Sequence, residues 1–185
     1  KHFKKGWKFM APQPVSMGIQ HLNPFNPNSI VSKYVVTEKA DGIRALLLIA
    51  NDNRGYLITS KKIVIDTGVI FDNVVNGWIF DGEYITKNKV GNNIHLFMAF
   101  DVYYVNEQST REFMFYPKDE DAENKYRLKI LYQFINELKP VSILDNKSNA
   151  EVKRVECKNI HNFQIKCKMF YHITKYTDEN GVEVN

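Results

Sequence analysis

Residues 34–50 have the sequence YVVTEKADGIRALLLIA. Two apolar runs of β-type residues flank a charged segment, and Lys39 lies in that segment between two carboxylates. Gly42 permits a tight turn or a close approach of the backbone to a ligand. The pattern predicts two strands, residues 34–38 and 43–50, with Lys39 on the connection between them.

The position of Lys39 suits a lysine nucleophile. At a pKa of about 10.4, roughly one lysine in two thousand is neutral at pH 7, and only the neutral amine attacks phosphorus. Burial, a neighbouring cation or a metal lowers the pKa of a lysine that has this role, and Arg44 is a candidate cation. The alternative is an exposed lysine in a hairpin turn, paired with Glu38 or Asp41.

Composition places the chain among globular proteins of about one domain. It has 185 residues, 44% of them apolar, and a net charge of +4. No apolar run approaches the ~18 residues of a membrane span, so we expect no membrane partner. The two cysteines, Cys157 and Cys167, form no CxxC pair, which argues against a zinc site and a disulfide framework. The modest positive charge favours phosphate-bearing partners only weakly.

After residue 34 the chain reads as strands joined by turn-rich linkers. The predicted strands cover residues 34–38, 43–50, 56–60, 62–65, 78–86, 94–104 and 163–171. Linkers this short do not accommodate parallel crossovers, which predicts an antiparallel sheet. Helical spacing of apolar residues predicts a helix over 120–138 with acidic residues at its start. The fold class is therefore α+β, a mainly antiparallel sheet with flanking helices.

Two acidic motifs follow Lys39 on predicted strands. The first is Phe80-Asp81-Gly82-Glu83-Tyr84, where alternation places Asp81 and Glu83 on one face of the strand. Two acids on one face repel each other unless a cation or ligand lies between them. A hairpin turn at Asp-Gly is the alternative, but the apolar residues on both sides favour one continuous strand.

The second motif is Ala99-Phe100-Asp101-Val102. Phe100 alone would be assigned to the core of the sheet. Asp101 is harder to assign there, since a buried carboxylate needs partners.

Together with Pro12-Gln13-Pro14-Val15-Ser16-Met17, these motifs resemble those of the covalent nucleotidyltransferases. KADGIR looks like the Lys-x-Asp-Gly-x-Arg signature shared by DNA ligases, RNA ligases and mRNA capping guanylyltransferases, and PQPVSM is similar to the stretch that precedes the lysine in the capping branch. The resemblance implies the nucleotidyltransferase (ATP-grasp-like, DNA ligase–capping enzyme) fold. It also implies that Lys39 takes GMP from GTP and passes it to the 5′-diphosphate end of an RNA.

The resemblance also implies site roles. Arg44 and Glu83 would hold the ribose, Phe100 would stack on guanine, and Asp41 would stay near Lys39. Lys168, with Lys166 as the alternative, would contact guanine. The implied nucleotide-binding residues are Asp41, Gly42, Arg44, Ser60, Glu83, Phe100 and Lys168. The implied metal is Mg²⁺ or Mn²⁺, held by Glu83 and Asp101.

The chain departs from the family pattern because motifs expected after residue 185 are missing. We therefore expect residues 1–185 to be a partial guanylyltransferase domain without the OB-fold domain, and we expect this piece alone to react with GTP far more slowly than a chain that includes those motifs. Triphosphatase and methyltransferase domains or subunits are further expected partners. The Asn-, Lys- and Ile-rich composition suits a large DNA virus, and hence the cytoplasm, a viral factory or the virion; a cellular source would imply the nucleus.

Two other functions compete with this hypothesis. An ATP-dependent DNA or RNA ligase would use the same covalent chemistry with adenine in the pocket. A non-catalytic remnant would bind RNA or a partner protein. The retained Lys39, Arg44 and Glu83 argue against the remnant.

Overall fold

The computed structural model describes residues 9–30, 34–71, 77–116, 126–138, 140–143, 156–157, 163–171, 176–177 and 183–184. The chain forms two compact units. The main unit comprises Lys1–Met10 and Ala40–Lys168, and the second comprises Ala11–Lys39 and Met169–Asn185. In the described part of the chain, no helix has the length and apolar character needed to cross a membrane.

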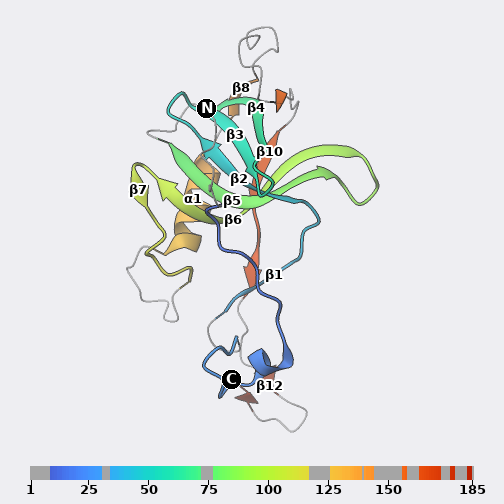
Figure 1. Cartoon of the computed structure of the whole chain (residues 1–185), viewed down its shortest axis with the longest axis vertical. Helices are drawn as coiled ribbons and strands as arrows, with labels where there is room; N and C mark the ends of the chain where they lie inside the picture. Colours follow the sequence, from blue (N-terminus) through green and yellow to red (C-terminus); the bar gives the residue numbers. More distant parts are fainter. Residues whose placement is uncertain are drawn as a thin grey trace. The chain divides into compact units, whose positions relative to one another are not determined.

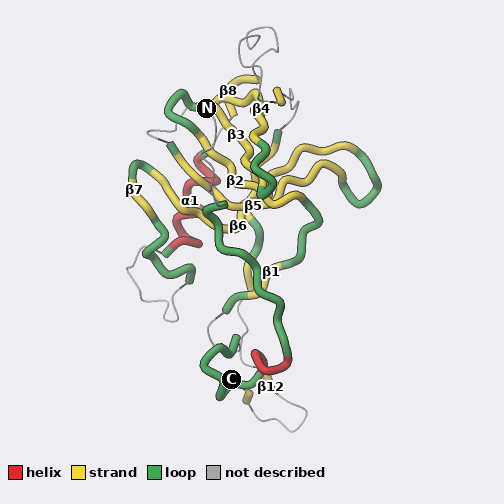
Figure 2. The backbone as a smooth tube through the Cα atoms, viewed as in Figure 1, coloured by secondary structure: helices red, strands yellow, loops and turns green. Residues whose placement is uncertain are grey.

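A nine-stranded sheet forms the main unit (Figures 1 and 2). Its strands are β2 (Ile43–Ile49), β3 (Arg54–Thr59), β4 (Val64–Phe71), β5 (Trp78–Lys87), β6 (Asn93–Val105), β7 (Gln108–Ser109), β8 (Pro140–Ile143), β9 (Glu156–Cys157) and β10 (Gln164–Cys167). The spatial order is β10-β6-β5-β2-β3-β4-β8, with β7 paired to β6 and β9 paired to β4. The predicted sheet-rich α+β class is confirmed, and β5 is continuous through Asp-Gly, which excludes a turn there.

Pairing in this sheet is mainly antiparallel, as predicted, with two exceptions. Strand β10 pairs with β6 in parallel, and β9 pairs with β4 in parallel. The linkers too short for a parallel crossover are those between the strands up to residue 104. Strand β10 instead returns after a long connection that includes α1, the kind of crossover that parallel pairing requires.

Helix α1 (Arg127–Glu137) is shorter than the predicted helix 120–138. Tyr126, its N-cap, has an extended backbone with φ −115° and ψ 150°, so the helix cannot continue through it. The predicted acidic first turn is wrong, because the first turn of α1 contains no acidic residue. The earlier part of the predicted helix, residues 120–125, lies outside the described residues.

Helix α1 lies against β6 and β10 and reaches the face of β5 that carries Trp78. The ring of Trp78 on β5 meets Phe134 of α1 edge-on, with 4.7 Å between the ring centroids. The helix also buries Leu128, Leu131 and Ile135. Phe80 lies on the same face of β5 as Trp78 and has no exposed surface. The apolar core therefore covers this face, and Asp81 and Glu83 alternate with it.

The second unit contains short elements only. They are the 3-10 helix η1 (Ile19–Leu22) and strands β1 (Val36–Thr37), β11 (Phe170–Tyr171), β12 (Tyr176–Thr177) and β13 (Glu183–Val184). Strand β1 pairs with β11, and β12 pairs with β13. Strand β1 pairs with β11, and β2 pairs with β3 and β5, so Lys39 does not lie in a hairpin turn between β1 and β2. Its side chain is exposed, as the alternative to a nucleophile also predicted. The predicted strand 163–171 is divided into β10 and β11 by Lys168 and Met169.

Two motif glycines are required by close packing. A Cβ on Gly42 would lie 2.9 Å from the carbonyl oxygen of Tyr84, and one on Gly82 would lie 2.5 Å from Cζ of Phe97. The Cβ on Gly82 would also lie 2.7 Å from the carbonyl oxygen of Met98. Backbone atoms in a paired strand cannot move away cheaply, so both positions exclude larger side chains.

We expect Gly82→Ala to destabilise the main unit by about 1–3 kcal/mol, because the added methyl group overpacks the contact between β5 and β6. Urea unfolding of the purified chain measures this difference. Val90→Ala is the control, since Val90 is 82% exposed in the β5–β6 turn. A Gly82→Ala protein as stable as the control would contradict the assigned contact.

Candidate functional site

Five side chains from the middle of the main sheet meet in what we call the charged–aromatic cluster. Its members are Arg44, Asp81, Glu83, Phe100 and Lys168, from β2, β5, β6 and the residue after β10. Arg44 lies directly opposite Glu83 in the pairing of β2 with β5. Every member was predicted from the sequence, and Asp81 was predicted as a motif residue without an assigned role.

Arg44 is held by a buried carboxylate. Its Nε donates to Oδ1 of Asp81 at 3.2 Å, and its Nη2 donates to Oδ2 at 2.7 Å. The hydroxyl of Tyr103 donates to the same Oδ2 at 2.7 Å. Asp81 has no exposed surface, so this forked pairing compensates for the loss of its hydration. Burial and the neighbouring Asp81 charge raise the pKa of Tyr103, which therefore stays a hydrogen-bond donor.

Glu83 and Phe100 share a second cation. Nζ of Lys168 lies 3.4 Å from Oε2 of Glu83, an ionic contact in which that oxygen accepts no hydrogen bond. The same Nζ lies 5.4 Å from the centroid of the Phe100 ring, and Cζ of Arg44 lies 5.6 Å from it. Both distances are within the range of a cation–π contact. The two acids of the β5 motif are thus each accompanied by a cation.

Lys168, and not Lys166, joins the cluster. Lys168 is 8% exposed, and its backbone N–H donates to the carbonyl oxygen of Ala99 at 2.8 Å. Lys166 lies opposite Met98 and its side chain is exposed. Between the two lysines left open by the sequence, the geometry therefore favours Lys168.

A β-bulge directs Phe100. Asp101 lies opposite Asp81, and Ala99 lies opposite Gly82, so Phe100 is the extra residue on β6. A bulge of this kind changes the direction of one side chain and interrupts the regular alternation of the strand. Sequence alternation alone could not predict it.

Asp101 has a different partner from the predicted metal. Nε of Arg127 donates to Oδ1 of Asp101 at 2.8 Å, and Nη2 donates to Oδ2 at 3.2 Å. The backbone N–H of Val102 also donates to Oδ1, at 2.8 Å. Burial raises the pKa of Asp101, although Arg127 acts in the opposite direction. Among the described residues there is no group of three His, Cys, Asp or Glu side chains that could hold a metal ion.

The other predicted site residues lie around the beginning of β2. Ser60 is exposed and follows Thr59, whose partner on β2 is Ala45, so Ser60 is at the same end of the sheet as Arg44. Asp41 and Gly42 are exposed and open the main unit, just before β2. Lys39 is exposed and belongs to the second unit, at the point where the chain passes into the main one.

Sequence reasoning missed three residues that contact these groups: Tyr103, Arg127 and Phe9. Cζ of Arg44 lies 5.8 Å from the centroid of the Phe9 ring. An acid inside an apolar run indicated that Asp101 needed a partner, but nothing in the pattern singled out Arg127. Phe9 and Tyr103 gave no signal above that of ordinary apolar residues.

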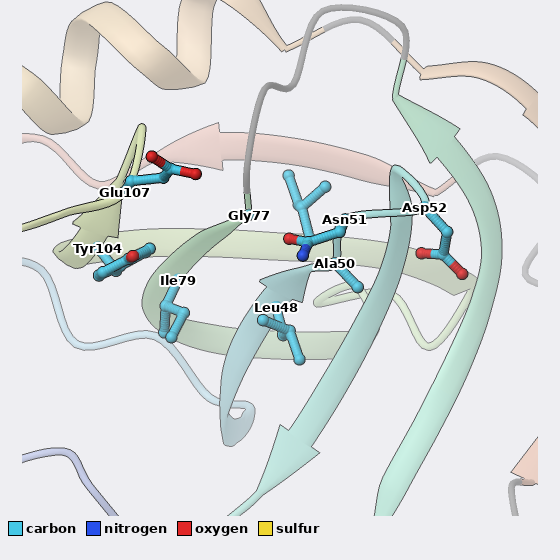
Figure 3. A pocket seen from close by; sticks show the side chains of 9 residues that line it. Leu48, Ala50, Asn51, Asp52, Gly77, Ile79, Tyr104 and Glu107 are labelled. Carbon is cyan, nitrogen blue, oxygen red and sulfur yellow. The ribbon is translucent and has the colours of Figure 1, made fainter.

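A cavity of about 580 Å³ is separate from the charged–aromatic cluster (Figure 3). It lies at the end of β2 and the beginning of β5, whereas Arg44 and Glu83 lie toward the other ends of these strands. Leu48 and Ile79 contribute apolar walls, and Asp52 and Glu107 contribute carboxylates. The described residues that line it include no lysine or arginine. This lining is unsuited to a phosphate group, in contrast to the charged–aromatic cluster.

Comparison with known families gives one match. The family model described as "mRNA capping enzyme, catalytic domain" matches residues 4–180, a range that includes Lys39 and every member of the cluster. No curated protein matches the chain.

We expect Asp81→Asn to lower the free energy of unfolding by about 2–4 kcal/mol, because it leaves the half-buried Arg44 without its counter-charge. Asp52→Asn is a matched control. Asp52 is exposed, and its Oδ1 accepts the N–H of Arg54 at 3.1 Å, a bond that an asparagine also makes. Chemical denaturation of the two variants measures the difference, and equal stabilities would contradict the assigned role of Asp81.

Proposed function

The chain belongs to the family of mRNA capping enzyme catalytic domains, and on that premise we propose that its guanylyltransferase reaction uses Lys39 as nucleophile and the charged–aromatic cluster as the nucleotide seat. Members of this family act on GTP and RNA. The observation that carries the proposal is that Lys168, which is far from Glu83 and Phe100 in the sequence, meets both of them at one place on the sheet.

In the proposed seat, guanine stacks on Phe100. An aromatic ring on which a base stacks contributes about 1–3 kcal/mol to binding. Glu83 accepts a hydrogen bond from a ribose hydroxyl, and Lys168 bonds an acceptor on guanine. Arg44 is fixed by its fork to Asp81, so its remaining donors face the nucleotide at little entropic cost. Ser60 and Gly42 border the same end of the sheet.

The first step forms a phosphoamide. The neutral amine of Lys39 attacks the α-phosphorus of GTP. The bond between this phosphorus and the oxygen that bridges it to the β-phosphate breaks, and pyrophosphate leaves with that electron pair. The nitrogen loses its proton to solvent. Arg44 is five residues from Lys39, and a chain of that length spans at most about 17 Å, so the nucleophile is tethered to the seat by the backbone itself.

The second step transfers GMP. A terminal oxygen of the 5′-diphosphate of an RNA attacks the same phosphorus, the P–N bond breaks, and Lys39 is regenerated as an amine after it takes up a proton. We propose that Asp41, two residues after Lys39, stays near this amine through both steps and favours its reprotonation.

The described residues do not form a metal site. Asp101 is engaged by Arg127, and Glu83 offers one carboxylate that already faces Lys168. A Mg²⁺ or Mn²⁺ ion on the triphosphate stays a prediction, and no step of this mechanism passes through it.

The remaining proposals concern the fold, the reactions before and after GMP transfer, and the location of the protein. We propose that the sheet belongs to the nucleotidyltransferase (ATP-grasp-like) fold and that residues 1–185 belong to a guanylyltransferase domain. Triphosphatase and methyltransferase activities on linked domains or subunits would supply the 5′-diphosphate RNA and consume the cap. A cytoplasmic or viral-factory location follows only if the source is viral.

We expect Lys39→Ala to abolish an acid-labile, protein-bound GMP, because Lys168, the other amine of the proposed seat, contacts Glu83 and is proposed to bind guanine and not the α-phosphate. Incubation with α-labelled GTP, followed by mapping of the modified peptide, measures the adduct. Lys89→Ala, which removes an exposed lysine from the β5–β6 turn, should label like the unaltered protein.

Two results would contradict this assignment: an adduct on another lysine, or full labelling of the Lys39→Ala protein. Competition with unlabelled ATP belongs in the same experiment. Stronger competition by ATP than by GTP would indicate an adenylating ligase.

We expect Lys168→Gln to weaken GTP binding about tenfold, a loss of one well-placed polar contact. Lys166→Gln, the matched control on the exposed side of β10, should change affinity by less than about twofold. Equilibrium binding of a fluorescent GTP analogue measures both. If the Lys166 variant loses more affinity, the assignment of Lys168 is wrong.

A further inference from the structure

Arg127 lies outside the nucleotide seat, yet it connects three parts of the main unit. Its backbone N–H donates to the carbonyl oxygen of Met114 at 2.9 Å, and its Nη1 donates to the carbonyl oxygen of Phe113. Its Cζ lies 5.6 Å from the centroid of the Phe115 ring. The remaining donors of the guanidinium form the fork with Asp101. Arg127 therefore fixes Asp101 relative to helix α1 and residues 113–115.

Asp101 is the residue next to the bulge at Phe100. As the extra residue on β6, Phe100 has no partner opposite it on β5, so its neighbours determine its position. Ala99 is held on one side by the N–H of Lys168, and Asp101 is held on the other side by Arg127. Without Arg127, only one of these two attachments remains.

The negative charge of Asp101 is a second reason why the bulge at Phe100 depends on Arg127. Asp101 lies opposite Asp81 across β5 and β6, and both carboxylates are buried. Like charges in directly opposite positions destabilise a strand pair. Here each carboxylate has its own arginine, Arg44 for Asp81 and Arg127 for Asp101. Loss of Arg127 would leave Asp101 uncompensated at the bulge that carries the aromatic ring.

From this geometry we propose that Arg127 is a positioning residue for the base platform: through Asp101 it fixes the bulge of β6 so that the Phe100 ring meets guanine. The inference rests on the proposed function, in which Phe100 stacks on the base. Arg127 contacts neither the nucleotide nor the reacting atoms. It acts on affinity for the base and leaves the chemistry of Lys39 unchanged.

The test compares Arg127→Gln, Phe100→Ala and the double variant in the formation of lysyl-GMP. We expect Phe100→Ala to raise the KM for GTP about tenfold and Arg127→Gln to raise it about fivefold, with the rate at saturating GTP within about threefold of the unaltered protein. The double variant should have the KM of Phe100→Ala within about twofold, because a ring that is absent cannot be positioned. Lys129→Gln, an exposed charge on the same helix, is the control.

Inorganic triphosphate separates positioning from general loss of structure. It has no base, so its inhibition constant should be the same in the Arg127→Gln and unaltered proteins within about twofold. If Arg127→Gln does not fold, Arg127→Lys retains the charge without the fork and should give a smaller rise in KM, again with an unchanged inhibition constant.

The outcomes distinguish the two proposals. A KM in Arg127→Gln within twofold of the unaltered protein, beside a raised KM in Phe100→Ala, overturns the role of Arg127. Multiplied effects in the double variant, or weaker inhibition by triphosphate, also overturn it. An unchanged KM in Phe100→Ala contradicts the platform in the proposed function itself, on which the role of Arg127 depends.

Discussion

The buried ion pair between Asp81 and Arg44 is the interaction on which the arrangement of the candidate site depends. A carboxylate without exposed surface in the middle of a sheet is tolerated only with a partner of good geometry, and the fork of Arg44 supplies it. The pair connects β2 to β5, and Tyr103 extends it to β6. Because these three strands are adjacent, one polar group fixes the relative position of most of the cluster.

Much of this sheet could be predicted from the sequence. Apolar runs bounded by turn residues gave β2, β5 and β6 to within one residue at each end. Strand β4 was predicted only to residue 65, because Asp66, Thr67 and Gly68 interrupt its apolar pattern. In the structure, Asp66 pairs with Arg54, and the hydroxyl of Thr67 donates to the carbonyl oxygen of Gly55. Long-range partners of this kind satisfy polar residues inside a strand, and no local pattern contains them.

The candidate site was predictable in part for a related reason. Motif order indicated Arg44, Glu83 and Phe100, which meet on the sheet, and it indicated Lys39, whose role stays a prediction. The partners of the two buried carboxylates were not predicted. Tyr103, which donates to Asp81, lies beyond a bulge, and Arg127, which pairs with Asp101, begins a helix whose predicted first turn was wrong. A local motif contains the residues of the site but not the distant residues that hold them in place.

The parallel pairing of β10 with β6 has a consequence for how the chain is made. Lys168 follows the last strand of the main sheet to be synthesised, and its partner Glu83 leaves the ribosome 85 residues earlier (168 − 83). Contacts between residues so distant in sequence form slowly, since a long loop must close first. A nascent chain can thus build the antiparallel strands while the cluster still lacks its lysine. Glu83 lacks its counter-charge, Lys168, until translation has passed β10.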